Sequence, residues 1–220
     1  MSDKNNEKWN VLLALYIQTK ELLIKAEELD VGHNTFIQTL QELKALLDHT
    51  MRIKAAELDI SAVPNSADKT EYISMNLDKA CGHAYRAFFD TADWFSIIIR
   101  EKIIEILNPY SRTAIIAAIP SYYSEIRPNI DALSAEVANL RLKKDVANNQ
   151  MLASVQKYAA TIDEMFDAAM DMQRKIGALE EYKFKEKRSS IKYWAVYIGV
   201  TVFIGIACVV LGWILQTKIG

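Results

Sequence analysis

An uncharged run of 23 residues, from Tyr193 to Leu215, limits the possible folds of this chain more than any other feature. As a helix it would be about 35 Å long at about 1.5 Å per residue, and the hydrocarbon core of a bilayer is about 30 Å thick. Twelve of its residues are Val, Ile, Leu or Phe, and aromatic residues stand near both ends, as they do at membrane interfaces. A buried core helix would carry a polar stripe, which this run lacks. We therefore expect a transmembrane helix over 193–215.

Basic residues are concentrated just before this run, in the segment KFKEKRSSIK, where Glu186 is the one acidic residue. Only Lys218 follows the run. Because cytoplasmic flanks carry the excess of Lys and Arg, the sequence predicts a cytoplasmic N-terminal part, a short translocated tail over 216–220 and a location in the inner cell membrane. The basic segment should contact anionic lipid headgroups through Lys183, Lys185, Lys187, Arg188 and Lys192.

Composition favours an all-α fold for the rest of the chain. Hydrophobic residues make up 51% of the 220, and there are only 7 Gly and 4 Pro. The net charge of −2 gives no sign of a nucleic-acid site. Cys81 and Cys208 lie far apart in sequence, which favours a reducing compartment over a disulfide framework. The polar N-terminus MSDKNNEKW lacks the apolar core of a signal peptide.

Apolar residues spaced by three and four predict three helices before residue 108. The first runs from about Asn5 to Leu29, the second begins near Thr35, and the third runs from about Thr70 to Leu107, with a loop at AVPNSAD and a stop at Asn108 and Pro109. The three–four series expected on the first helix comprises Trp9, Leu12, Leu13, Tyr16, Ile17, Lys20, Leu23 and Ile24. That of the second comprises Phe36, Ile37, Leu40, Leu43, Leu46 and Leu47.

A short helical turn at IIAAI, closed by Pro120, precedes a long final run that opens at Pro128. That run has coiled-coil-like a/d spacing with a slip near DVANNQ. Two arrangements fit: helices packed within one bundle, or a coil between chains. We divide the chain into a helical bundle over 1–128, a helical or coiled-coil stalk over 129–192, the membrane helix and the tail. The core positions expected in the run are Ile130, Leu133, Val137, Leu140, Lys144, Ala147, Met151, Val155, Tyr158, Ile162, Met165, Ala169, Met172, Ile176 and Leu179.

The third helix carries a coherent charged face, which is the candidate binding or assembly site of the chain. At about 100° per residue its members cover roughly one third of the circumference, opposite an apolar side. The face could be solvated, could bind a partner helix or a second copy, or could be a reaction site. The charged face comprises His83, Arg86, Asp90, Asp93, Arg100 and Glu101, and the apolar side Tyr85, Phe88, Phe89, Ala92, Phe95, Ile99 and Ile103.

Catalysis is the least favoured of these interpretations. Helical ribonucleases of the nucleotide-binding class of higher eukaryotes and prokaryotes use Arg, four residues, then His, and this spacing does not occur. The sequence also has no phosphate-binding Gly-rich loop, GxSxG or HExxH motif, and no CxxC or His-rich metal pattern. We expect a non-enzyme with no catalytic residue, cofactor or metal.

Small residues in the membrane run allow close helix approach. Ala195 and Gly199 form a small-xxx-small pair, and Gly205, Cys208 and Gly212 share one face. Self-association in the bilayer is one explanation, and the general frequency of Gly in membrane helices is the other.

The layout of helical bundle, heptad run and C-terminal anchor resembles syntaxin-like fusion proteins, which carry a central Gln at a core position. Gln150 and Gln156 each lie one residue off the core phase here. The layout also resembles small transmembrane effectors of bacterial anti-phage systems, encoded beside retrons or CRISPR nucleases. This second resemblance implies a membrane toxin that is inactive until infection.

We therefore expect a membrane-anchored effector that self-associates and disturbs the inner membrane when triggered, in bacterial antiviral defence. The alternative is a tail-anchored adaptor that recruits a cytosolic partner. The expected partners are the lipid bilayer, further copies of the chain, and a cytosolic protein or ribonucleoprotein regulator.

Overall fold

The computed structural model describes residues 3–30, 32, 36–60, 68–142 and 151–219. The described residues form helices and contain no strand, so the all-α prediction is confirmed. Part of the DVGHN break and of the AVPNSAD loop lies outside these ranges, as do Lys144 and Ala147. The elements are α1 (Asp3–Leu29), α2 (Ile37–Glu57), α3 (Lys69–Leu107), α4 (Arg112–Ala118), the π-helix η1 (Tyr122–Ile126), α5 (Arg127–Leu142), α6 (Met151–Arg174) and α7 (Ile176–Ile219).

Local capping chemistry sets the ends of the longest helix of the bundle. The Asp68 carboxylate accepts a 3.1 Å hydrogen bond from the Thr70 backbone N–H, which satisfies one free donor of the first turn of α3. At the other end Asn108 caps the helix, and Pro109 cannot continue it. Ser111 then caps α4 by accepting from the Ala114 N–H at 3.0 Å. The helix boundaries near residues 70 and 107 therefore agree with the prediction.

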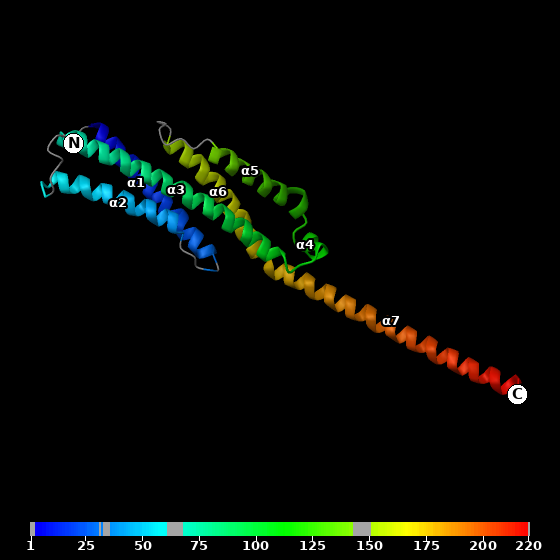
Figure 1. Cartoon of the computed structure of the whole chain (residues 1–220). Coiled ribbons are helices and arrows are strands. Elements are labelled where there is room, and N and C mark those ends of the chain that lie inside the picture. Colours follow the sequence, from blue (N-terminus) through cyan, green and yellow to red (C-terminus); the bar gives the residue numbers. More distant parts are fainter. Residues whose placement is uncertain (1–2, 31, 33–35, 61–67, 143–150, 220) are drawn as a thin grey trace.

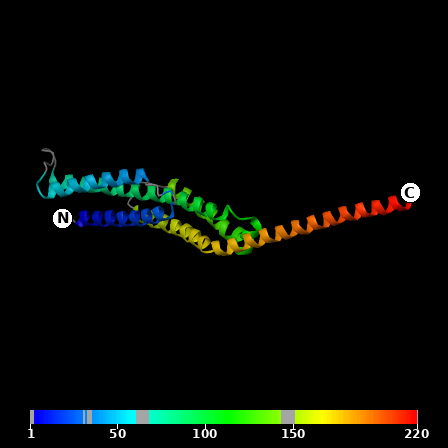
Figure 2. The ribbon, with the colours of Figure 1, turned by 90° about the horizontal axis from the view of Figure 1, so that it is seen from below.

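The bundle is built around α3, as Figure 1 shows. Helices α1 and α2 each pack along α3, and α6 packs against both α3 and α1. In Figure 2, α3 lies between α1 and α2. Helix α5 packs on α6 and reaches α3 at fewer positions. α3 therefore contributes the largest share of the core, in keeping with its apolar side, which is the most continuous in the sequence.

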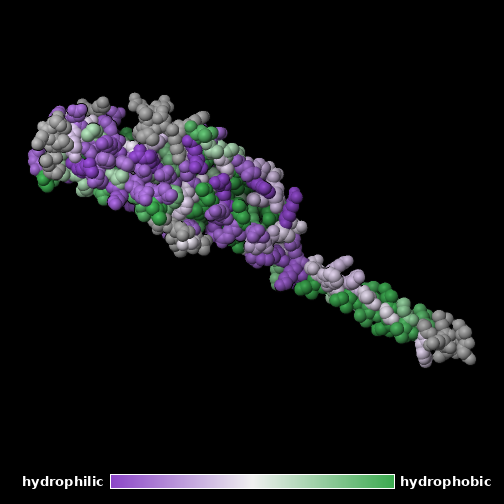
Figure 3. All heavy atoms as spheres, viewed as in Figure 1, coloured by the Kyte–Doolittle hydropathy of each residue, from purple (hydrophilic) through white to green (hydrophobic). Residues whose placement is uncertain are grey.

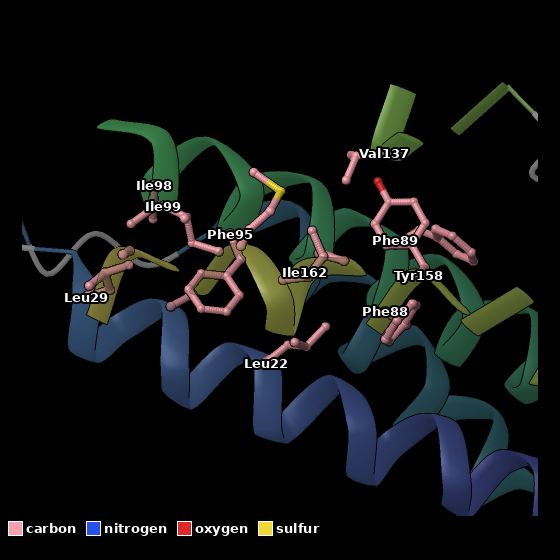
Figure 4. Packing of buried hydrophobic residues seen from close by; sticks show 14 of the residues in the cluster. Leu22, Leu29, Phe88, Phe89, Phe95, Ile98, Ile99, Val137, Tyr158 and Ile162 are labelled. Carbon is pink, nitrogen blue, oxygen red and sulfur yellow. The ribbon is translucent and has the colours of Figure 1, made fainter. Parts of the chain in front are cut away.

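Aromatic rings fill the centre of the core, where α1, α3 and α6 meet (Figure 4). Phe88, Phe95 and Tyr158 are fully buried. The Phe89 and Tyr158 rings make an edge contact at 4.9 Å between centroids, and Phe95 packs on Phe166 at 5.5 Å. Each such side chain stabilises the fold by about 1.5–3 kcal/mol through burial. The seven residues predicted for the apolar side of α3 are all buried, which confirms that side as core.

The final heptad run folds back on itself in the bundle. α5 and α6 are antiparallel neighbours in Figure 1, and together they pack against α3. Of the two arrangements left open, the chain therefore has the intramolecular one over 127–142 and 151–174. Nine of the predicted core positions are buried, and Leu133, Leu140 and Ile176 are partly buried against the core. The buried ones are Ile130, Val137, Val155, Tyr158, Ile162, Met165, Ala169, Met172 and Leu179. Lys144, Ala147 and the side chain of Met151 lie outside the described part.

The expected apolar sides of α1 and α2 were wrong in part. On α1 the buried residues include Leu15, Leu22 and Ala26, whereas Leu13 and Ile17 are each 52% exposed. On α2 the buried residues are Thr39, Ile53 and Ala56. Exposed apolar residues remain on α2 at Ile37, Leu40, Leu47 and Met51. Both helices carry apolar residues on more than one side, so spacing alone did not identify the side that packs on α3.

Helix α7 leaves the bundle and extends well beyond it (Figure 1). Lys175 alone separates it from α6, and its first turns still pack on the bundle through Ile176 and the buried Leu179. Its 44 residues correspond to about 66 Å of helix. Beyond the basic segment, the coloured part of α7 is mostly apolar in Figure 3. One described helix, α7, is long and apolar enough to cross a membrane.

Candidate functional site

The first part of the predicted charged face lies against α2. Glu42 on α2 accepts a 3.0 Å hydrogen bond from Arg86 Nε, and its Oε2 lies 2.7 Å from His83 Nδ1. All three side chains are partly buried: Glu42 is 24% and His83 22% exposed. A charge at this depth costs free energy unless it is paired, and Glu42 supplies the partner. This end of the face therefore joins two helices of the same chain.

The His83 ring has two competing neighbours. Its Nδ1 also lies 2.7 Å from Arg86 Nη2, which can only donate. If Nδ1 carries a proton it donates to Glu42, and if it does not it accepts from Arg86. The two contacts cannot both be hydrogen bonds at one time, so the tautomer of His83 is coupled to the position of the Arg86 guanidinium.

A second imidazole extends this group. His49 on α2 stacks on His83 with ring centroids 5.3 Å apart, and its Nδ1 lies 2.9 Å from Asn76 Oδ1. Asn76 in turn donates to the Tyr72 carbonyl at 2.9 Å. His49 is therefore partly buried against α3. The group has the residue types of a proton relay, but each member is engaged in holding α2 on α3.

The middle of the face meets α5 and α6. The Tyr158 hydroxyl on α6 donates to Asp93, whose other carboxylate oxygen lies 3.1 Å from Arg141 Nε on α5. Burial, and next the hydrogen bond to Asp93, raise the pKa of Tyr158 above its usual value. The hydroxyl therefore remains a donor at any ordinary pH. Asp93 is the point at which α3, α5 and α6 are held together by polar contacts.

The remaining members of the face have separate surroundings. Asp90 is partly buried and engaged, whereas Arg100 and Glu101 are exposed. Arg100 donates from Nε to the Ser96 carbonyl at 3.1 Å. The six predicted residues therefore do form one angular face of α3, but the structure distributes them over contacts with α2, contacts with α5 and α6, and solvent.

Below this face, at the C-terminal end of α3, lies a cavity of about 440 Å³. Its walls come from α3, the turn after it, α4, η1 and α5. Arg100 is shared with the charged face, so the exposed end of that face opens into the cavity. Nothing in the sequence pattern indicated this cavity, because its lining is drawn from five separate segments.

The predicted lipid-contacting residues lie on the exposed surface of α7. Lys183 and Lys185 make contacts within the helix, with Glu180 at 3.7 Å and Glu181 at 2.7 Å. The hydrogen bond with Lys185 lowers the pKa of Glu181, and the same contact raises that of Lys185. Lys187, Arg188 and Lys192 are exposed.

The predicted packing residues of the membrane run also belong to α7. Ala195, Gly199, Gly205 and Cys208 are exposed. A Cβ atom added at Gly199 or Gly205 would meet no atom within 4 Å. Gly212 lies in the helix, but its surroundings are outside the described side chains.

Three further side chains complete the polar contacts. Glu42 and Arg141 were not singled out from the sequence, and Tyr158 was expected in the core but not in this site. Glu42 gave no distinctive signal, because polar residues such as Gln41 and Lys44 alternate with leucines around it. Among the described residues no group of three or more His, Cys, Asp or Glu side chains could hold a metal ion.

The fold and these contacts define an all-α protein in which one of the described helices is long and apolar enough to cross a membrane. Comparison with known proteins does not identify a family: no protein-family model, no curated protein and no solved structure matches the chain.

Proposed function

We propose that this protein is a single-pass, membrane-anchored effector that self-associates and disturbs the inner membrane when triggered. Its setting would be bacterial antiviral defence, as the resemblance to small anti-phage effectors implies. The observation that carries the proposal is the continuity of α7, which starts in the packed bundle and ends beyond the apolar run without a break.

A continuous helix transmits movement. Leu179 is buried in the bundle, and Tyr193 begins the apolar run four turns later on the same helix. A displacement of the bundle around Leu179 would therefore tilt or rotate the membrane segment, because an α-helix without Pro or a bulge bends only gently. The basic residues between these positions favour a cytoplasmic bundle close to anionic headgroups.

Two uncovered apolar stripes support self-association. On α1 the exposed stripe includes Leu13, Ile17 and Ile24, each about half exposed. On α2 the exposed apolar residues are three, four or seven positions apart, which keeps them on one side of the helix, and the last of them is the C-cap residue. The α2 stripe comprises Ile37, Leu40, Leu47, Met51 and Leu58.

The charges beside the two stripes are complementary. The exposed charged residues beside the α1 stripe are Lys20, Glu21, Glu27 and Glu28, and those beside the α2 stripe are Lys44, Asp48, Arg52 and Lys54. The first set is acidic on balance and the second basic. Helices α1 and α2 lie on either side of α3 (Figure 2), so α1 of one copy could receive α2 of the next.

A tail-anchored adaptor is the second candidate. The observation in its favour is the same α2 stripe, which a cytosolic amphipathic helix could cover instead of a second copy. A syntaxin-like fusion protein is a further form of this alternative, and it requires the helices over 130–179 to leave the bundle and form a coil between proteins.

Expression of the chain in bacteria separates these functions. An effector is expected to depolarise the membrane and slow growth, and deletion of 193–215 should abolish both effects. Normal growth together with a soluble partner that co-purifies would support the adaptor. An SDS-resistant helical complex through 130–179 would support the fusion protein.

Continuity of α7 has its own test. A flexible Gly-Ser insertion at Arg188 should remove depolarisation by uncoupling the bundle from the membrane run. The matched control inserts an equally long helix-forming segment, such as Glu-Ala-Ala-Ala-Lys, at the same place. Equal depolarisation by the two insertions would show that α7 does not act as a mechanical link.

A further inference from the structure

The cavity at the end of α3 has the dimensions and the floor of a small-molecule site. Its volume of about 440 Å³ lies within the range of about 300–1,000 Å³ that such sites occupy. Ile103, Leu107 and Ile115 line it and are buried, which provides an apolar floor. Burial of an uncharged part of a ligand there would therefore favour binding.

Two exposed cationic side chains line this cavity, and the part of the lining that they form is called its mouth here. Arg100 from α3 and Arg127 from the start of α5 both line it, and both are exposed. Within the described part of the chain, neither guanidinium has a carboxylate at ion-pair distance. Asp131 is the one carboxylate of the lining. Guanidinium groups match phosphate and carboxylate oxygens with two parallel hydrogen bonds, so the mouth is suited to an anion.

Two tyrosine rings also line the cavity. Tyr122 and Tyr123 line the cavity with centroids 4.9 Å apart in an edge contact. The Arg112 guanidinium lies 4.9 Å from the centroid of Tyr123. Burial raises the pKa of the Tyr122 hydroxyl, so that hydroxyl remains a donor. Aromatic faces of this kind pack on planar rings.

The π-helix η1 holds these tyrosines in place. The Ile126 N–H bonds to the Ser121 carbonyl at 3.1 Å, and that of Arg127 bonds to Tyr122, each five residues back. Pro128 has no N–H to give to a carbonyl of the preceding turn, which interrupts the ordinary α-helical ladder beside η1. π-Helical turns occur frequently at functional sites.

One wall of the cavity touches the helix that leads to the membrane run. Tyr110 lines the cavity, and its hydroxyl donates to Glu180 on α7 at 2.7 Å. Lys183 Nζ lies 5.1 Å from the centroid of the same ring. The neighbouring Ser111 hydroxyl lies 2.7 Å from the Glu186 carboxylate. A change in the position of Tyr110 would therefore reach α7 directly.

We propose that this cavity binds a small organic anion, with its phosphate or carboxylate between Arg100 and Arg127 and a planar apolar ring against Tyr122 and Tyr123. Binding is transmitted to α7 through Tyr110 and Ser111. The transmission rests on the function proposed above, since it supplies the trigger of the effector, whereas the ligand site itself does not depend on that function.

The binding step is tested by calorimetric titration of the purified full-length chain in detergent micelles. The probes are adenosine 5′-monophosphate, 2-naphthylacetate, adenosine and inorganic phosphate. We expect a probe that combines ring and anion to bind at least about 10-fold more tightly than adenosine or phosphate alone. Comparison of the first two probes shows whether phosphate or carboxylate is the preferred anion.

Arg100→Gln and Arg127→Gln should each raise the Kd of the preferred probe about 10-fold or more, as expected for loss of a charged hydrogen-bonded pair. Arg174→Gln is the matched control, because Arg174 is exposed on α6 and pairs locally with Asp171. No binding by any of the four probes to the folded chain would overturn the site, and so would binding that survives both arginine substitutions.

The transmission step is tested by hydrogen–deuterium exchange over 176–190, with and without the preferred probe. Binding should change exchange in the wild type. Tyr110→Phe keeps the ring but loses the hydrogen bond to Glu180, so it should bind within about 3-fold and lose the exchange response. An equal response in this variant would overturn the route through Tyr110. Binding without any depolarisation of cells would overturn the proposed function and leave the ligand site standing.

Discussion

The Tyr110 hydroxyl donates a 2.7 Å hydrogen bond to the Glu180 carboxylate, although the two residues are 70 positions apart in the chain. Partial burial and this contact raise the pKa of Tyr110 to about 12. The turn after α3 is thereby joined to the first part of α7. Ser111 and Glu186 repeat the connection two turns further along α7. The bundle therefore holds α7 at its start, before the helix extends away from it.

Replacement of Glu42 by Gln should weaken the contact between α2 and α3. The neutral amide still accepts one hydrogen bond, but the charge that compensates the partly buried Arg86 is lost. We expect a destabilisation of about 1–3 kcal/mol, measured by urea unfolding of the full chain in detergent. Glu21→Gln is the control, since Glu21 is exposed on α1. Equal unfolding midpoints for the two variants would contradict a supporting role for Glu42.

Replacement of Tyr158 by Phe removes one hydroxyl from the core and little else. Asp93 then keeps its contact with Arg141 but loses the hydrogen bond from the Tyr158 hydroxyl. The Asp93 side chain is only 14% exposed. The expected loss of stability is about 1–2 kcal/mol, seen as a lower thermal midpoint by circular dichroism. Tyr16→Phe on the outer side of α1 serves as the comparison. A midpoint that falls equally in both variants would argue against the contact with Asp93.

The Cys81 thiol should react slowly in the folded protein. Burial raises its pKa from 9.0 to about 11, and it donates to the Lys8 carbonyl at 3.5 Å. At pH 8 the thiolate population is therefore about 100-fold below that of a free thiol. Iodoacetamide labelling in a Cys208→Ser background measures this, with the urea-unfolded chain as the reference. Equal labelling rates in the two states would refute the prediction.

The same shift gives a pH dependence with a definite sign. The folded state holds the Cys81 proton more tightly than the unfolded state does. The stabilising contribution is complete below pH 9.0 and is lost as the pH rises to about 11. Cys81→Ala should flatten the decline in unfolding free energy over this interval, and an unchanged slope would count against it.

Complementation tests whether α1 of one copy contacts α2 of the next. Ile17→Glu should disable the α1 stripe and Leu47→Glu the α2 stripe, so each variant alone should sediment as a monomer in detergent. A mixture should recover a dimer through the two intact stripes. Gln38→Glu, at an exposed polar position of α2, is the control. If Ile17→Glu still self-associates and mixing recovers nothing, the contact is between two α2 helices instead.

The sequence predicted α3 and the final heptad run well, for a common physical reason. Phe88, Phe95, Tyr158 and Ile162 lie on helices whose apolar residues are concentrated on one side, and that side is buried, although α3 leaves Ile97 and Ile104 exposed. Capping residues such as Asp68 act within a few positions, so they fix helix ends without reference to the rest of the fold.

The candidate site was predicted less completely. The charged face of α3 follows from the 100° rotation per residue, so His83, Arg86 and Asp93 could be grouped from sequence. Their partners could not, because Glu42 is 41 positions from His83 and Tyr158 is 65 positions from Asp93. The spacing along one helix carries no information about which other helix lies against it.

The sequence alone determined the helical character of the chain and the apolar length of 193–215. It also determined the buried side of each helix whose apolar residues are concentrated on one side. Only the tertiary structure decided the rest. α1 and α2 carry apolar residues on more than one side, and α3 can cover one side of each, so packing left Leu13, Ile17, Leu40 and Leu47 at the surface. The cavity near Arg100 likewise exists only because five separate segments meet, and burial energy depends on that meeting rather than on any single segment.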